Sequence, residues 1–370
     1  MILLSGVYAM ASETTTDHFV VSCDEVLLPG NDGDEPYVCV NVSLDGANIY
    51  TLYQMDIQFP EGVVPYEEDG EYWVIMDEDD GIYPYTKKAG KKTFTHSLLC
   101  NFGTIDSKER CLRISCMSSQ NDEFKATSGS LFYMYIKASA FAKPGNLVLK
   151  FSGQAFGKKV DSDIVKYVPE DMTDETVQIS TTSKVALNVS SANKWGTCVV
   201  PFDAALPAGV KAYTANEIVN DGASALLKEA ESLKAYTPYV LYAENGYKGT
   251  ITGTVNPADY VEVAENGLLK GAVVGQSKSD GYVLQNLNSE VGFYKMNGQE
   301  FSIPEGKCWL EPATGAKDVI EFVFDNPTGI EEMPGAECKV QGEVYSLSGV
   351  RVNEGYKGIV IENGKKVIIR

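Results

Sequence analysis

Residues 37–60 read "YVCVNVSLDGANIYTLYQMDIQFP", and the alternation of apolar and polar side chains in this stretch decides the fold class. A period of two is typical of half-buried strands, because successive side chains of a strand point to opposite faces. The alternation returns at residues 111–118, 129–138 and 146–153, with turns marked by Gly and Pro between them. Short strands without long intervening helices predict a β-sandwich.

A second strand-rich block covers residues 187–326 and includes "VIEFVFD" at 319–325. One segment inside it, "ASALLKEAESLKAY" (223–236), has the composition of a helix and lacks Pro and Gly. Residues 166–186, between the two blocks, are polar, acidic and rich in Thr. Such a composition indicates either a linker or a crossing edge strand.

The chain ends in "GIVIENGKKVIIR" (358–370), where Asn363-Gly364 fits the two-residue turn of a β-hairpin. Residues 327–337 carry two Pro and two Gly and predict a linker before this ending. Residues 335–370 carry 4 acids and 6 bases, a net charge of +2, whereas residues 1–165 carry 24 acids and 13 bases, a net charge of −11. The tail therefore differs in charge from the body.

The charge of the whole chain restricts its partners. With 51 acidic and 31 basic residues the net charge is −20, which argues against nucleic acid and against anionic membrane surfaces. No stretch reaches the ~18 apolar residues of a membrane span.

The start of the chain predicts export. Residues 1–11, "MILLSGVYAMA", contain an apolar run and a small-x-small cleavage pattern at Ala9-Met10-Ala11, although the positive start of a signal peptide is missing. We interpret them as the remnant of a signal peptide, the alternative being a frayed apolar terminus. The mature chain is then expected to be secreted or to lie at the cell surface.

Catalytic and zinc motifs are missing from the sequence. None of the eight cysteines forms a Cys-x-x-Cys pair, and only two histidines are present, so a zinc site is not expected. In an exported chain the cysteines form disulfides or remain buried thiols, and both alternatives stay open. Gly-x-Ser-x-Gly, His-Glu-x-x-His and Gly-x-Gly-x-x-Gly do not occur. We therefore expect a protein that is not an enzyme, although a glycosidase would draw its two carboxylates from distant positions.

Residues 66–92 form the most unusual stretch, since eight acids are followed by four lysines. Asp77, Asp79 and Asp80 crowd oxygen ligands on one turn, which suits calcium, although the spacing is not that of an EF-hand. Alternatively, flat aromatic faces in this stretch stack on sugar rings, the candidates being Tyr72, Trp73, Tyr83 and Tyr85. The third interpretation is a solvated acidic tip above core aromatics.

Residues 19–160 resemble cohesin modules. The resemblance is carried by the order of four stretches: "LLPGNDGDEPYVCVNVSLDG", "YTLYQMDIQFPEGV", "THSLLCNF" and "LRISCMSSQNDEFKATSGSLFYMYIKA". It implies a nine-stranded jelly-roll sandwich that binds dockerin helices or, in related sandwiches, polysaccharide. The acidic insertion at 66–85 departs from the family pattern and puts a dockerin-type face in doubt.

Residues 187–326 resemble a β-rich module of secreted proteins of the Bacteroidetes phylum. The resemblance is carried by "NKWGTCVVPFDAALPAGVKAYTA", "SLKAYTPYVLYAENG" and "GYVLQNLNSEVGFYKMNGQEFSIPEGKCWLEP". It implies strands at "ALLKEA" (225–230) and "LKAYTPYVLY" (233–242), against the helical composition of that segment.

The ending "VYSLSGVRVNEGYKGIVIENGKKVIIR" (344–370) resembles the C-terminal sorting tail of the type IX secretion pathway, although the family tail is usually longer. The match is carried by Tyr345, Leu347, Gly349, Arg351, Val352, Gly358, Ile359, Asn363, Gly364 and Lys366. It implies recognition by the secretion machinery. A terminal hairpin that pairs with the second domain is a compatible alternative.

Together these features predict an all-β chain with a jelly-roll, cohesin-like sandwich at 12–165, a second β-rich domain at 187–326 and a small β tail at 338–370. We expect a non-catalytic exported protein that binds a polysaccharide or another secreted protein through the first sandwich. A self-associating structural surface protein, or an accessory module of polysaccharide degradation, is the alternative. No cofactor is expected apart from the calcium candidate.

Overall fold

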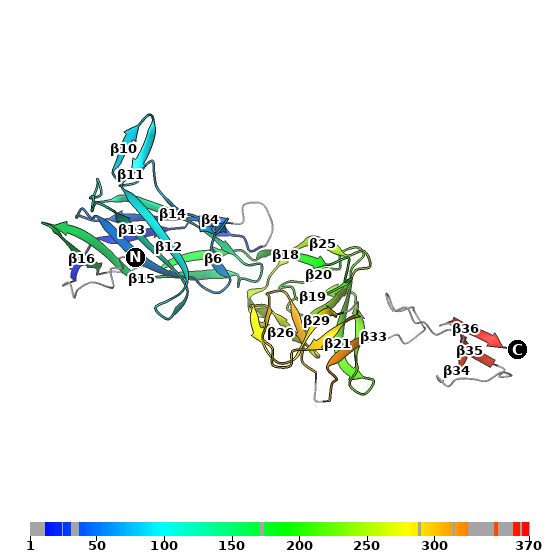
Figure 1. The fold of residues 1–370 in the computed structure, drawn as a ribbon. Coiled ribbons are helices and arrows are strands. Elements are labelled where there is room, and N and C mark those ends of the chain that lie inside the picture. Colours follow the sequence, from blue (N-terminus) through cyan, green and yellow to red (C-terminus); the bar gives the residue numbers. More distant parts are fainter. Residues whose placement is uncertain are drawn as a thin grey trace.

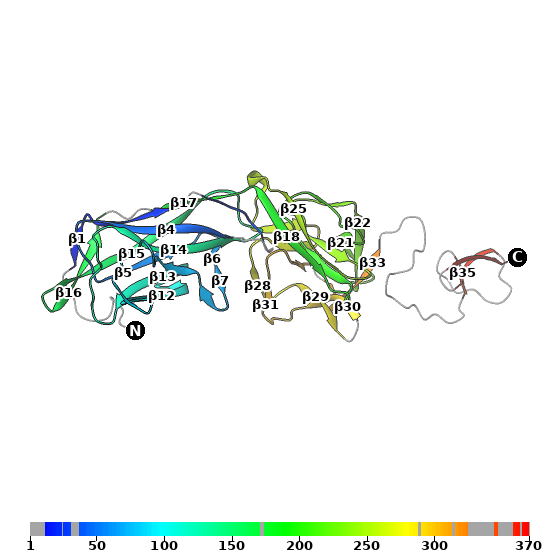
Figure 2. The same ribbon diagram turned by 90° about the horizontal axis from the view of Figure 1, so that it is seen from above.

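The computed structural model describes residues 12–23, 25–30, 37–170, 174–287, 290–312, 315–324, 344–346, 358–362 and 365–369. In these ranges the chain is almost entirely strand, with one short 3-10 helix, η1 (Pro257–Asp259), and no α-helix. The expected all-β fold class is confirmed. Figures 1 and 2 show two β-rich modules lying end to end. Among the described residues, no helix has the length and apolar character needed to cross a membrane.

The first module is a sandwich of two sheets. The first, which we call the β5 sheet, has the order β1 (Glu13–Thr15), β16 (Asp163–Pro169), β15 (Gly145–Val160), β5 (Leu52–Gln58), β13 (Lys108–Ser118) and β12 (His96–Ile105). In addition, β17 (Glu175–Ile179) pairs with β15, and β3 (Val26–Leu27) pairs with β17. The second, the β14 sheet, has the order β2 (His18–Ser22), β4 (Tyr37–Asp45), β14 (Gly129–Ala138) and β6 (Val63–Pro65), with β9 (Val74–Met76) also paired to β14.

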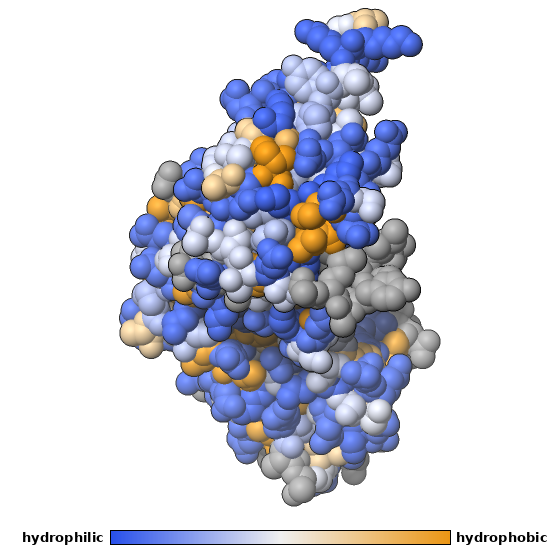
Figure 3. Space-filling view, turned by 90° about the vertical axis from the view of Figure 1, so that its left-hand side faces the viewer, coloured by the Kyte–Doolittle hydropathy of each residue, from blue (hydrophilic) through white to orange (hydrophobic). Residues whose placement is uncertain are grey.

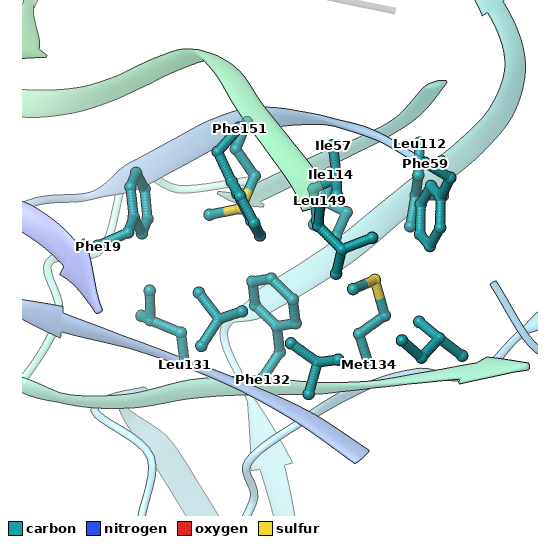
Figure 4. Close-up of a cluster of buried hydrophobic side chains, with 14 of the residues drawn as sticks. Phe19, Ile57, Phe59, Leu112, Ile114, Leu131, Phe132, Met134, Leu149 and Phe151 are labelled. Carbon is teal, nitrogen blue, oxygen red and sulfur yellow. The ribbon is translucent and has the colours of Figure 1, made fainter. Parts of the chain in front are cut away.

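Alternating side chains from the two sheets meet in the core of this module. Every second residue of β4 is buried, as the period of two predicts, and the same holds for β14 from Phe132 to Ala138. Leu131, next to a bulge in β14, is buried as well. Figure 4 shows the result: Ile57, Ile114 and Phe151 of the β5 sheet face Phe132 and Met134 of the β14 sheet. These side chains are at most 4% exposed, so one continuous apolar layer holds the sheets together.

Two hairpins interrupt one edge of the β14 sheet. Strands β6 and β9 both pair with β14, so they are two halves of one edge strand. Between them the chain leaves the sheet as the hairpin β7 (Glu67–Glu68) and β8 (Glu71–Tyr72). After β9 a second hairpin, β10 (Tyr85–Lys88) and β11 (Lys91–Phe94), projects from the sandwich (Figure 1).

The second module is built around a path of ten strands. Their order is β19 (Trp195–Cys198), β24 (Tyr239–Tyr242), β21 (Lys211–Val219), β22 (Ser224–Ala230), β33 (Val319–Phe324), β30 (Glu290–Lys295), β29 (Tyr282–Leu287), β32 (Cys308–Leu310), β27 (Leu269–Ala272) and β26 (Val263–Asn266). Three two-stranded ladders accompany it: β18 (Thr182–Val189) with β25 (Tyr247–Thr254), β20 (Ala204–Ala205) with β23 (Ser232–Leu233), and β28 (Gln276–Lys278) with β31 (Phe301–Ile303).

Residues 223–236 contain no helix, and β22 confirms the strand expected at 225–230. Of the strand expected at 233–242, only Leu233 and Tyr239–Tyr242 are strand, and residues 234–238 form a turn between them. Strand β22 lies between β21 and β33 and hydrogen-bonds to both. Its Ala225 and Leu227 are buried in the module core. Strand pairing and burial therefore override the helical propensity of this segment.

The two modules are joined by the loop between β14 and β15. Ala140 and Phe141 of this loop are 0% and 4% exposed and belong to the core cluster of the second module. The Ser139 hydroxyl donates to Glu305 Oε2 at 2.6 Å, and the Ser183 hydroxyl donates to the Ala140 carbonyl at 2.6 Å. The stretch 166–186, expected as a linker or crossing edge strand, contains the end of β16, all of β17 and the start of β18.

Near the C-terminus, β34 (Val344–Ser346), β35 (Gly358–Glu362) and β36 (Lys365–Ile369) form a small antiparallel sheet. The register places Glu362 opposite Lys365, which confirms the strands of the expected hairpin. Several expectations lie outside the described residues: the signal-peptide remnant 1–11, the linker 327–337, and the tail residues Gly349, Arg351, Asn363 and Gly364. The seven described cysteines are free thiols.

Candidate functional site

Four aromatic side chains gather on the outer surface of the β14 sheet. Tyr135 alternates along β14 with buried Met134 and Ile136, so its ring points away from the core. Neighbouring ring centroids lie 4.7 Å apart for Tyr37–Tyr66, 4.9 Å for Tyr66–Trp73, 5.6 Å for Trp73–Tyr135 and 5.2 Å for Tyr37–Tyr135. All four side chains are partly exposed. We call Tyr37, Tyr66, Trp73 and Tyr135 the aromatic cluster.

Backbone hydrogen bonds fix the position of the cluster. The Tyr66 amide donates to the Tyr135 carbonyl at 2.8 Å, and the Tyr135 amide donates to the Trp73 carbonyl at 2.9 Å. The Trp73 amide donates to the Tyr66 carbonyl at 2.9 Å and closes the base of the β7–β8 hairpin. Tyr66 and Trp73 therefore flank the point where the hairpin leaves the edge strand. Their rings are placed by the sheet itself, before any ligand binds.

The cluster combines apolar ring surface with phenol hydroxyls. Burial raises the pKa of Tyr135, with further contributions from Cys39 and Tyr37, so its hydroxyl stays neutral. The Lys137 ammonium lies 5.6 Å from the centroid of the Tyr66 ring, within the range of a cation–π contact. Such a surface can bury an apolar ligand face and exchange hydrogen bonds with hydroxyl groups.

The four aromatic residues expected from the sequence do not share one surface. Trp73 joins the cluster, whereas Tyr72 packs beside the first core with its ring 5.9 Å from that of Phe102. Tyr83 is fully buried and its hydroxyl lies 2.7 Å from that of Tyr53, so it cannot contact a ligand. Tyr85 is 41% exposed on the β10–β11 hairpin, apart from the other rings.

Strand geometry explains these placements. Tyr72 and Trp73 are consecutive in the chain, so their side chains leave the backbone on opposite sides. Sequence reasoning missed Tyr37, Tyr66 and Tyr135. The available signal was Tyr135 at an outward position of the alternating stretch 129–138, where a polar side chain is the usual choice.

The expected calcium residues form a turn. The Asp77 carboxylate accepts the amides of Asp79 and Asp80 at 3.1 and 3.0 Å and the Tyr133 hydroxyl at 2.9 Å. Burial raises the pKa of Asp77, but these hydrogen bonds lower it by a larger amount. The pKa of Asp77 is therefore below its ordinary value. Asp79 pairs with Lys92 at 3.0 Å. Within the described ranges no group of three or more His, Cys, Asp or Glu side chains is arranged to hold a metal ion.

The outer face of the β5 sheet carries an ionic network. Asp56, which is 1% exposed, accepts from Arg113 Nε at 2.7 Å and Nη2 at 2.9 Å, and from Lys108 Nζ at 3.2 Å. Burial raises the pKa of Asp56, but the two cations lower it by more, so the carboxylate stays ionised. Arg113 also binds Asp106 at 2.6 Å. A carboxylate held between two cations is a structural anchor and is poorly suited to act as a general base.

Comparisons with known proteins identify cohesins among similar structures. A non-cellulosomal cohesin from Archaeoglobus fulgidus is 12% identical, covers 44% of this chain and 90% of its own, and has a TM-score of 0.27. A type I cohesin from Pseudobacteroides cellulosolvens is 10% identical, with coverages of 43% and 92% and a TM-score of 0.29. A cohesin–dockerin complex from Clostridium thermocellum is 11% identical, covers 45% of this chain and 97% of its own, and has a TM-score of 0.29. These likenesses assign no ligand or partner to the chain.

No protein-family model matches the sequence, and no curated protein matches it.

Proposed function

We propose that the chain is a non-catalytic carbohydrate-binding protein whose aromatic cluster receives a polysaccharide. The observation that carries the proposal is the presence of four aromatic rings on an outer sheet face, with neighbouring centroids 4.7–5.6 Å apart and backbone bonds that hold two of them in place. Core aromatics of a sandwich point inward. An outward group of this size instead offers the apolar surface on which a sugar ring can stack.

Polar groups beside the cluster fit the same ligand. The neighbouring β7–β8 hairpin carries exposed carboxylates, among them Glu67, Glu68 and Glu71, which can accept hydrogen bonds from sugar hydroxyls. The phenol of Tyr135 stays protonated and can donate. Because the edge strand and β14 hold the rings in place, little conformational entropy is lost on binding.

We further propose that the protein acts outside the cell, as a secreted or surface-attached chain. Residues 1–11 would serve as the remnant of an export signal, and residues 338–370 as a tail read by a type IX-like secretion machinery in a Bacteroidetes-type cell. The support for this part is the sequence match of the tail.

Retention on insoluble polysaccharides tests the binding proposal. The full chain is offered a panel of washed polysaccharides, and the bound fraction is compared with that of Trp73→Ala and Tyr85→Ala. Tyr85 is the matched control, because it is an exposed aromatic residue of the same insertion that lies outside the cluster. We expect retention of the native chain and of the Tyr85 variant, and a loss of at least about tenfold in affinity for the Trp73 variant. Equal retention of both variants would contradict the proposal.

A second candidate, binding of a secreted protein, is favoured by the outer face of the β5 sheet. Leu99 is 57% exposed there, and Met117 lies opposite Leu52 in the strand register on the same face. An apolar stripe beside the Asp56 network is the kind of surface that a protein partner covers. Leu99→Asp should then abolish binding of a purified protein partner while polysaccharide retention persists. The opposite result would assign the partner to another surface.

A further inference from the structure

Two exposed hairpins of opposite charge are inserted in the first module, one before β9 and one after it. The acidic hairpin, β7–β8, contains Glu67, Glu68, Asp69 and Glu71, and the basic hairpin, β10–β11, contains Lys87, Lys88, Lys91 and Lys92. Both close with a two-residue loop whose φ angles are positive: 53° and 84° at Asp69-Gly70, and 51° and 82° at Ala89-Gly90. They are therefore built on one plan, Glu-Asp-Gly-Glu in one case and Lys-Ala-Gly-Lys in the other.

The arrangement of lysines in the basic hairpin lowers the stability of that hairpin. Lys88 lies directly opposite Lys91, and Lys87 lies directly opposite Lys92. Like charges at opposed positions of two strands are destabilising, and an isolated two-stranded hairpin is marginal to begin with. A mixture of Lys and Glu would serve the fold better. The fold alone therefore does not account for four lysines at this tip.

The positive charge of the basic hairpin is largely left free for an outside partner. Lys92 binds Asp79, but in the described part of the chain no ion pair engages Lys87, Lys88 or Lys91, all of which are exposed. Figure 1 shows the hairpin standing clear of the sandwich, and its tip at the top of Figure 3 is hydrophilic. A partner can thus approach both faces of the tip.

We propose that the basic hairpin of one molecule docks on the acidic hairpin of a second copy of this chain. The chain itself supplies the complementary surface, since its net charge is −20. Glu68 and Glu71 flank the acidic loop at the same positions at which Lys88 and Lys91 flank the basic loop. No ion pair joins the two hairpins within one molecule among the described residues, so the acids are also available.

The proposed contact has a definite character. It joins two different surfaces, so repeating it links molecules head to tail unless the rotation closes a ring. It is made of exposed ion pairs and is therefore weak and sensitive to salt. An exported chain with this contact would form short assemblies at high local concentration.

Sedimentation and light scattering of the full chain over a concentration series test the proposal. We expect self-association in low salt that disappears near 1 M salt, where the Debye length is about 3 Å. Lys87→Glu/Lys88→Glu/Lys91→Glu should weaken association about 3- to 150-fold, the combined effect of three exposed ion pairs. The control Lys150→Glu/Lys228→Glu/Lys248→Glu changes the net charge equally at exposed lysines elsewhere and should retain most of the association.

A charge-swap mixture makes the test specific. Glu67→Lys/Glu68→Lys/Glu71→Lys should also stop self-association, and an equal mixture with the Lys-to-Glu variant should associate again, because each supplies the charge that the other lacks. Circular dichroism checks that every variant is folded. The proposal is overturned if the control weakens association as much as the hairpin variant, if the mixture does not associate, or if the native chain stays monomeric in low salt up to the highest concentration measured. The proposal is also contradicted if the native chain does not self-associate but binds an anionic polysaccharide through these lysines. The partner of the basic hairpin would then be a polyanion and not a second copy of the chain.

Discussion

Removal of the Phe141 ring should destabilise the second module, although the residue belongs to a loop of the first. The ring is 4% exposed and packs in the core cluster that contains Val199 and Phe202. The backbone of the second module closes over it so tightly that a Cβ on Gly306 would lie 3.0 Å from the ring. Truncation to Ala in a site of this kind costs about 3–5 kcal/mol, because the cavity closes only in part.

Urea unfolding of the full chain, followed by tryptophan fluorescence, measures this cost. In a Trp73→Phe background the remaining tryptophans, Trp195 and Trp309, belong to the second module and report its transition. Phe141→Ala should lower the free energy of unfolding of that module by about 3–5 kcal/mol. The matched control is Phe151→Ala, which removes a ring of the same 4% exposure from the first core. It should leave the tryptophan-reported transition nearly unchanged.

A change below about 1 kcal/mol for Phe141→Ala, or an equal effect of Phe151→Ala on the second module, would refute this description of the joint.

Three further predictions concern titratable groups. Asp56→Ala should destabilise the first module by about 3 kcal/mol at neutral pH, since it leaves the half-buried Arg113 and Lys108 partly unpaired. Because the folded pKa of Asp56 is lowered, this contribution is present above the ordinary carboxyl pKa and is lost as the pH falls through the folded value, so urea unfolding should show the difference shrinking in acid. Burial raises the pKa of Glu305 at the joint between the modules, so the folded protein loses stability as the pH rises through the pKa of Glu305 in the folded state. Glu305→Gln should therefore raise the melting temperature at neutral pH. A lower melting temperature would contradict this prediction. Calcium or a chelator should not change the melting temperature of the native chain. Asp77→Ala should lower the melting temperature with or without calcium, because it removes three hydrogen bonds. A calcium-dependent rise in melting temperature that is lost in Asp77→Ala would instead support a metal site.

The alternating strands were predictable because their periodicity is local. The stretches 37–44, 53–60, 111–118 and 129–138 overlap β4, β5, β13 and β14, and the pattern of buried residues follows the sequence pattern. Residues 223–236 show the limit of local information. Their composition favours a helix, and pairing of β22 with the preceding β21 and with β33, which is distant in the chain, makes residues 224–230 a strand.

The candidate site was only partly predictable, because it depends on tertiary neighbours. Nothing in the sequence marks β6 and β9 as halves of one edge strand, yet this arrangement is what brings Tyr66 beside Trp73. Tyr83 is a tyrosine like Tyr66 and lies in a similarly acidic stretch of the sequence, but its side chain is buried in the first core. The sequence around Phe141 predicts a loop, but its side chain belongs to the core of the neighbouring module.

The central claim is that the aromatic cluster binds saccharide. Its most direct test is a calorimetric titration of the full chain with soluble oligosaccharides released from the polysaccharide that retains it. We expect one binding site per chain, with an affinity that falls at least about tenfold in Trp73→Ala and is unchanged in Tyr85→Ala. An equal affinity for the native chain and the Trp73 variant, or no binding of any saccharide, would contradict it.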